Sequence, residues 1–265
     1  MVAFAFERDE TGGVTVLLDG HPQSYVHPND PGLLSFEYMQ HLAIALDALP
    51  AGPLVVTHVG GAGLTLPRYV EHTRPGSPQI VLEPDAALTE AVRIQIPLPR
   101  RHRIKVRAVA GAEGLEALRD DSADVVVIDA FASGQVPASL TGMACASDVA
   151  RVLRPGGVLA MNLADEPGLA HAYRVAATAA QALPHVGMLA LHEVFKGKRF
   201  GNVVLVASNR ALPEQVLTRR AASAPFPTGW RSAAATARRA ASSRPFGDIG
   251  DPSPSPPAPG SWRRR

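Results

Sequence analysis

VVTHVGGAGLTLPRYV, residues 55 to 70, runs from an apolar stretch through a turn with three glycines into helix-forming residues. Gly60, Gly61 and Gly63 carry no Cβ atom, so the backbone of this turn can come close to a ligand. We expect the N–H groups at the start of the following helix to be free to donate hydrogen bonds. A strand, a glycine turn and a helix in this order predict the ligand-binding turn of an open α/β sheet.

The chain up to residue 208 alternates strand-like and helix-like segments. Apolar, β-branched runs that do not alternate with polar residues are typical of parallel strands buried on both faces. Residues 186–195 and 201–208 predict a closing antiparallel pair, and residues 14–19 and 23–26 predict an N-terminal β-hairpin. The predicted fold class is α/β, with a Rossmann-like, mostly parallel sheet and a closing antiparallel strand. Its parallel strands are expected over residues 53–59, 79–83, 104–109, 123–129 and 157–163.

Composition divides the chain into three segments. We expect an N-terminal β-hairpin region over 1–30, a Rossmann-like nucleoside-binding domain over 31–211, and a basic tail over 212–265. The tail has a net charge of +6 and the preceding part a net charge of −4. Because the tail is rich in Pro, Ser and Arg and poor in regularly spaced aliphatic residues, it is predicted to be disordered, with a short helix near 232–241. Because this charge is not expected to lie with interleaved aromatic residues in a folded groove, no nucleic-acid partner is expected.

Length and composition bound the class of protein. A chain of 265 residues that is 46% hydrophobic can bury a full-sized core. No apolar run reaches the roughly 18 residues that cross a bilayer, and we expect a cytoplasmic protein without a membrane span. The single cysteine, Cys145, lies in a helix-like stretch and is expected to be a buried structural thiol. His21, His58 and His102 show no metal-ligand spacing, so no metal is expected.

Glu83 ends the run that follows the glycine turn, twenty residues after Gly63. A carboxylate at this place can accept hydrogen bonds from both hydroxyls of a ribose, so the combination predicts an adenosine-containing ligand. Leu66 stands where a dinucleotide fingerprint needs its third glycine, and the sequence has no Tyr-x-x-x-Lys pair. A nicotinamide oxidoreductase is therefore not expected. The alternative is that the three glycines only make a tight strand-to-helix turn.

Two further stretches give the chain a family resemblance. ARVLRPGGVLAMNL, residues 150 to 163, resembles the late part of class I S-adenosylmethionine-dependent methyltransferases. Leu-Asp-Gly at 18–20 followed by Gln23 resembles the N-terminal pattern of spermidine and spermine synthases, polyamine aminopropyltransferases built on the same fold. The likeness continues to residue 208. It implies a transferase that uses S-adenosylmethionine or its decarboxylated form as cosubstrate, takes a small-molecule acceptor such as an amine, and forms a homodimer.

The resemblance also implies roles for single residues. Asp129 is expected near the reactive sulfonium, as the catalytic residue. Glu113 is a substitute for the family's Asp that contacts the adenine amino group, whose place falls near Gly111 or Ala112. The residues expected to hold the nucleoside are Gln23, Gly60, Gly61, Gly63, Glu83 and Glu113.

The chain departs from the family where a polyamine is handled. In the family's Asp-Ser-Ser/Thr-Asp-Pro loop the second Asp takes a proton from the attacking amine, and here that position is Ala132. The Asp of the family's Gly-Gly-Gly-Asp turn aligns with Gly63, and its substrate-side Tyr aligns with Phe36. A polyamine needs several carboxylates to replace its water. Three functions therefore stay open: aminopropyl transfer, methyl transfer, which needs no strong base, and non-catalytic nucleoside binding or interaction.

Overall fold

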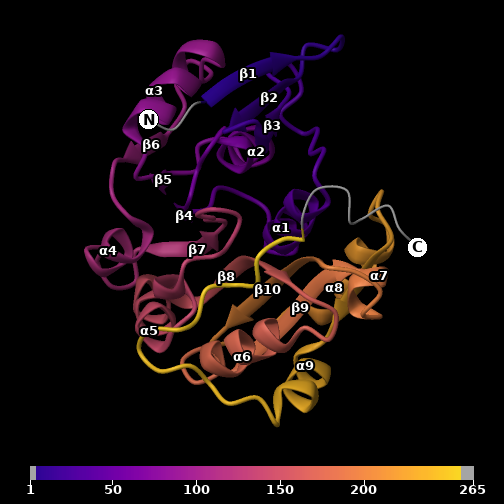
Figure 1. Cartoon of the computed structure of the whole chain (residues 1–265). Coiled ribbons are helices and arrows are strands. Elements are labelled where there is room, and N and C mark those ends of the chain that lie inside the picture. Colours follow the sequence, from indigo (N-terminus) through magenta and orange to yellow (C-terminus); the bar gives the residue numbers. More distant parts are fainter. Residues whose placement is uncertain (1–3, 258–265) are drawn as a thin grey trace.

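The computed structural model describes residues 4 to 257, which form an α/β fold around an eight-stranded sheet (Figure 1). Residues 1–3 and 258–265, which the expected first and last segments include, lie outside the described residues. The predicted fold class is confirmed. From one edge to the other the strands are β11 (Thr228–Arg231), β9 (His185–Leu191), β10 (Gly201–Ser208), β8 (Leu153–Asp165), β7 (Ala123–Ile128), β4 (Val56–Val59), β5 (Gln79–Leu82) and β6 (Ile104–Arg107).

Strands β8, β7, β4, β5 and β6 are parallel neighbours, as predicted. β10 is the expected closing strand and runs antiparallel between β8 and β9. The other strand of the expected pair, predicted over residues 186–195, is shorter than expected. β9 ends at Leu191, and the residues after it form the short helix α7 (His192–Phe195). The strand expected over residues 157–163 is longer at both ends: β8 already begins at Leu153 and ends at Asp165, and Gly156, with φ +84°, lies within it.

Helices cover both faces of the sheet (Figure 1). In β7, Val125 and Val127 pack toward one group of helices, whereas Val126 and Ile128 pack toward the other. This double burial explains the unbroken apolar runs in the sequence. One face carries α1 (Glu37–Asp47), α2 (Thr65–Thr73), α3 (Ala86–Gln95) and α8 (Glu214–Ala222); the other carries α4 (Gly111–Glu116), α5 (Met143–Val152), α6 (Ala170–Ala179) and α9 (Ala233–Ala240).

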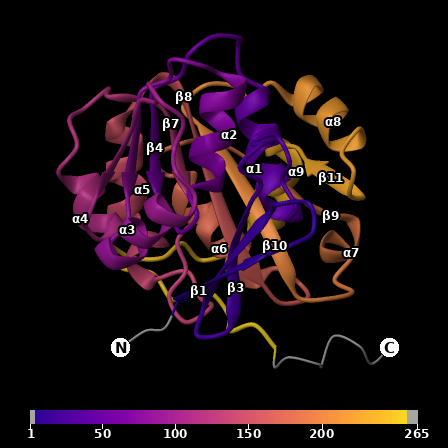
Figure 2. The same ribbon diagram turned by 90° about the horizontal axis from the view of Figure 1, so that it is seen from above.

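The N-terminal hairpin is confirmed and belongs to a separate three-stranded antiparallel sheet. β2 (Val14–Leu18) and β3 (His21–Val26) are the predicted strands, and β1 (Phe4–Arg8) adds a third that was not predicted. Apolar side chains of this sheet share a core with α3 and β5. Figure 2 shows it lying across the end of the large sheet.

The tail is folded where it was expected to be disordered. It forms α8, β11 and α9, and α9 confirms the expected short helix, beginning after Ser232, whose Oγ accepts a hydrogen bond from Ala235 N at 3.2 Å. The disorder prediction is wrong for residues 212–257 because the tail needs no core of its own. Its few apolar side chains, such as Leu217, Ala240 and Phe246, are buried in cores that the rest of the chain builds.

Cys145 lies in α5 with 5% of its surface exposed, as expected for a structural thiol. Burial, and next the charge of Asp148, raise the pKa of this thiol to about 12. Among residues 4–257, none of the helices combines the length and the apolar character that a bilayer crossing requires.

Candidate functional site

Three of the predicted residues meet where neighbouring parallel strands end. Asp129 follows β7, Gly60 follows β4 and Glu83 follows β5, and the residues just before them are paired in register across the three strands. Backbone hydrogen bonds extend this register by one residue, since Gly60 N donates to Leu82 O and Asp129 N donates to Val59 O, both at 2.9 Å. The three residues therefore lie at the same level of the sheet edge, where ligands of α/β folds bind.

The first glycine of the turn is required by the geometry of its neighbours. Gly60 has φ +88°, and a Cβ atom there would overlap the carbonyl oxygen of Asp129. Any other L-residue at this position would also be strained by that φ value. The turn is thus packed directly against the end of β7, which brings Asp129 beside it.

The turn's N–H groups are not free, which corrects the expectation from the sequence. Glu83 Oε2 accepts hydrogen bonds from Gly61 N at 3.0 Å and Ala62 N at 3.2 Å, and Gly63 N donates to Ser24 Oγ at 3.1 Å. The Glu83 carboxylate, at the end of the next strand, is close enough to accept hydrogen bonds from the first two of these N–H groups. Glu83 Oε1 accepts from Asp85 N at 3.0 Å, so the carboxylate is held in place from both sides.

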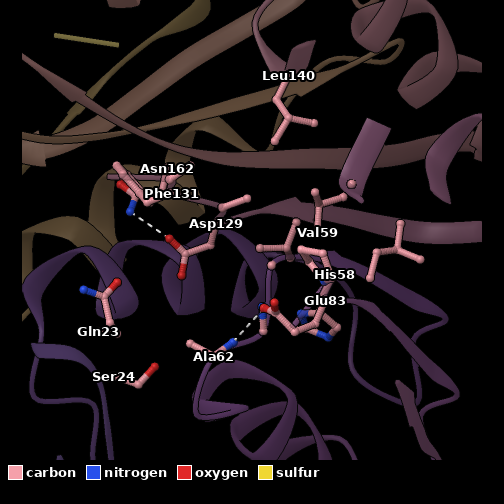
Figure 3. A pocket seen from close by; sticks show the side chains of 18 of the residues that line it. Gln23, Ser24, His58, Val59, Ala62, Glu83, Asp129, Phe131, Leu140 and Asn162 are labelled. Carbon is pink, nitrogen blue, oxygen red and sulfur yellow. Dashed lines mark hydrogen bonds between the residues drawn. The ribbon is translucent and has the colours of Figure 1, made fainter. Parts of the chain in front are cut away.

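A cavity of about 600 Å³ lies above these strand ends, and Figure 3 shows part of its wall. Gln23, Gly60, Gly61, Glu83 and Asp129, all predicted site residues, line it. Two predicted residues are not brought there. A Cβ atom at Gly63 would lie 2.8 Å from Ser24 Cβ, so Gly63 faces β3 and not the cavity. Glu113 is exposed in the first turn of α4, two residues after Gly111, which does line the cavity.

Asp129 is half-buried and forms one end of a polar ladder, of which Figure 3 shows the hydrogen bond between Asn162 and Asp129. Its Oδ1 accepts a hydrogen bond from Asn162 Nδ2 at 2.9 Å, and Asn162 Oδ1 accepts one from Asn202 Nδ2 at 3.1 Å. Burial raises the pKa of Asp129 to about 6, and the bond from Asn162 opposes this rise. The carboxylate is therefore ionised at neutral pH and titrates close to it. Both asparagines line the cavity, and sequence reasoning missed them although each interrupts an apolar strand.

Tyr38 lines the cavity, whereas Phe36, which aligns with the family's tyrosine, stacks beside it with ring centroids 5.8 Å apart. Burial, and then the charges of Asp129 and Glu37, raise the pKa of Tyr38 well above its ordinary value. Tyr38, with a hydroxyl that stays neutral, therefore lines the cavity two residues after the aligned position.

Negative charge predominates in the cavity wall. Its lining includes the carboxylates of Glu83, Asp85 and Asp129, and no Lys or Arg belongs to the described lining. His58 also borders the cavity; it is buried, its Nε2 lies 2.9 Å from Gln79 Oε1, and burial lowers its pKa to about 4, so it is neutral. Ala132 lines the wall without adding a further acid.

No family model and no curated protein matches this chain in sequence. Solved structures do resemble it. A protein described as a probable spermidine synthase from Corynebacterium glutamicum is 27% identical, with a TM-score of 0.87 over 96% of each chain. A spermidine synthase in complex with the transition-state analogue AdoDATO is 18% identical, with a TM-score of 0.57 over 84% of this chain and 74% of the other. Human methyltransferase-like protein 13 in complex with SAH is 20% identical, with a TM-score of 0.57 over 80% of this chain and 96% of the other.

Proposed function

Because the chain has the spermidine synthase-like form of the class I methyltransferase fold, we propose that it is a transferase whose cosubstrate is an S-adenosyl nucleotide. The observation that carries the proposal is the placement of Glu83 and Asp129 in one cavity, at the ends of strands on either side of β4. The complexes with AdoDATO and SAH among the similar structures support a ligand of this class.

Glu83 and the glycine turn form the nucleoside end of the proposed site. A carboxylate has about four lone-pair positions, and the backbone N–H groups already occupy three of those of Glu83. The remaining lone-pair position of the Glu83 carboxylate can accept a hydrogen bond from a ribose hydroxyl. The backbone bonds already hold this side chain in place, so it need not reorient when the ligand binds. Gly60 and Gly61 line the cavity beside Glu83, because without Cβ atoms they can pack closely against Asp129 O and Val81. Gln23 lines the same cavity from β3.

Asp129 forms the transfer end. Above about pH 6 its carboxylate is charged, which favours a sulfonium or an amine beside it and provides an acceptor for the proton that an attacking amine releases. The ladder through Asn162 to Asn202 fixes the orientation of this carboxylate. Tyr38 adds a hydroxyl to the same end.

The charge of the wall favours the decarboxylated nucleotide as donor. S-adenosylmethionine carries a carboxylate, which would lie in a cavity with three acidic side chains and no described Lys or Arg. Decarboxylated S-adenosylmethionine is only cationic. We therefore propose aminopropyl transfer to a small amine as the leading activity.

Methyl transfer is the second candidate, and Ala132 favours it. The loop that follows Asp129 supplies no second acid, so a substrate with several positive charges gains less here than in the aminopropyltransferases that the chain resembles. Methyl transfer can proceed from alignment of the sulfonium with an acceptor.

Calorimetry with methylthioadenosine, S-adenosylmethionine and its decarboxylated form tests these proposals. Glu83→Ala should weaken methylthioadenosine binding by about 1.5 to 3 kcal/mol, the value of hydrogen bonds to a charged acceptor. Glu90→Ala, an exposed residue of α3 outside this cavity, is the matched control and should bind normally. Tighter binding of the decarboxylated nucleotide supports aminopropyl transfer, and tighter binding of S-adenosylmethionine supports methyl transfer. If the folded wild-type chain binds none of the three, the proposed function is wrong.

A further inference from the structure

We propose that the C-terminal strap, residues 244–257, positions the roof loop, residues 130–142, over the cavity, so that strap attachment and nucleoside binding strengthen each other. The inference rests on the proposed function for the identity of the ligand. The roof loop supplies one wall of the cavity, from Ala130 to Leu140. No strap residue belongs to the described lining, so any effect of the strap on a ligand passes through the loop. Figure 1 shows the strap, in yellow, leaving the region of α9 and passing beside α5.

The roof loop depends on Ser253 of the strap for its buried hydrogen bonds. Val136 and Ser253 each have 0% of their surface exposed. Val136 N donates to Ser253 Oγ at 2.8 Å, Ser253 N donates to Val136 O at 3.1 Å, and the side chain of Gln135 donates to Ser253 O. Without Ser253 the peptide groups of Val136 would be buried without partners, which is unfavourable.

A second attachment lies at the end of the loop, where two glycines face each other. A Cβ atom on Gly250 would overlap Thr141 Oγ1, and one on Gly142 would overlap Asp248 O. This close approach lets Gly250 N donate to Ala138 O at 3.1 Å, and Thr141 Oγ1 donate to Asp251 O at 2.8 Å. The strap and the loop are therefore fitted to each other through their backbones.

The strap is anchored independently, on α5 and α6. Because Gly142 has no side chain to cap α5, the helix begins with Met143 N donating to Gly247 O at 2.7 Å and Ala144 N donating to Asp248 O at 3.2 Å. On α6, the Arg174 guanidinium lies 3.8 Å from the centroid of the buried Phe246 ring. These contacts hold the strap to the body of the fold, from which Ser253 reaches the loop.

Coupling of this kind is reciprocal, because a ligand that favours the ordered loop must also favour the attached strap. Methylthioadenosine should thus slow hydrogen exchange at the amides of Gly250 and Ser253, although neither lines the cavity. A strap that only stabilised the fold would show no such response below the unfolding transition.

The experiment compares two pairs of full-length variants. Ser253→Ala removes the acceptor for Val136 N, and its control Ser255→Ala changes an exposed serine of the same strap. Gly250→Ala adds the methyl group that overlaps Thr141, and its control Gly247→Ala adds the same methyl group where nothing lies within 4 Å. Amide hydrogen exchange of the roof loop and calorimetry with methylthioadenosine are measured at a temperature at which all the variants are folded.

We expect Ser253→Ala and Gly250→Ala each to speed exchange of the roof-loop amides about tenfold and to weaken methylthioadenosine binding by a similar factor, with both controls unchanged. Unchanged exchange in both test variants would overturn the proposal, as would unchanged affinity in a chain that binds methylthioadenosine. If wild-type protein does not bind this nucleoside, the proposed function fails, and the exchange rates alone still decide whether the strap holds the loop.

Discussion

Asp129→Asn should make the protein more stable at neutral pH, by an amount that grows as the pH rises. The substitution removes the charge but keeps an oxygen that can accept the hydrogen bond from Asn162 Nδ2. Burial raises the pKa of Asp129 from 3.8 to about 6 in the folded chain. Because the folded pKa is the higher one, the stability associated with the neutral carboxyl is complete below about pH 3.8 and is lost as the pH rises through about 6.

The structure sets the expected size of the effect. The interval between the two pKa values means that ionisation of Asp129 lowers the unfolding free energy of the wild-type chain by about 3 kcal/mol at pH 7.5. At pH 5 the loss is about 1.6 kcal/mol. The advantage of Asp129→Asn over wild type should therefore widen by about 1.4 kcal/mol between these two pH values. His41 and His58 also make stability depend on pH in this range, because burial lowers their folded pKa values to about 4, below the unfolded value of 6.5; both are present in both chains, so their effect cancels in the difference.

Urea unfolding followed by circular dichroism at the two pH values measures this difference. Asp121→Asn is the matched control, since Asp121 is exposed and asparagine accepts its positive φ of 50°. We expect the control to differ from wild type by the same small amount at both pH values. An advantage of Asp129→Asn that does not change with pH, or a less stable variant, would refute the account of Asp129 as a carboxylate held at a cost in stability.

Three further predictions concern single residues. Gly60→Ala should destabilise the fold by several kcal/mol more than Gly52→Ala in urea unfolding, because both have positive φ but only Gly60 faces an atom, Asp129 O, that a Cβ would overlap. Burial lowers the pKa of His58 to about 4, below its unfolded value of 6.5. Neutral His58 therefore contributes about 3 kcal/mol to the unfolding free energy, which is complete above pH 6.5 and is lost as the pH falls through 4. His58→Gln should therefore flatten the acid side of the stability profile measured by urea midpoints, and an unchanged slope would contradict this. The Cys145 thiol, with its pKa raised to about 12, should resist a thiol-reactive dye in the native protein and react in urea; native reactivity would show that α5 opens.

Much of the fold could be predicted because local patterns and burial agree. The parallel strands are continuous apolar runs since helices cover both sides of the sheet, and their order along the chain indicates where the ligand turn lies. The tail could not be predicted in this way. Leu217 and Phe246 are isolated in sequence, and they are buried only because distant segments provide their partners.

The site was predictable at the level of strand ends and less so at the level of hydrogen bonds. Gly60, Glu83 and Asp129 each follow an apolar run, so their convergence could be derived from the parallel pairing. Which donors Glu83 takes depends on distances of a few tenths of an ångström across two strands. Gly63 and Glu113 lie outside the cavity lining, which the sequence could not indicate, because the packing of β3 and the rotation of α4 are set by tertiary contacts.

The pairing of β11 with β9 has a consequence for chains that lack the tail. β9 is an apolar strand of seven residues, and β11 occupies its outer edge through residues Thr228 to Arg231. A chain shortened before residue 228 would leave the outer edge of β9 unpaired. Strands of other copies could then pair with this edge and form aggregates. We therefore expect the solubility of such truncated forms to depend on β11, a four-residue strand that does not belong to the cavity lining.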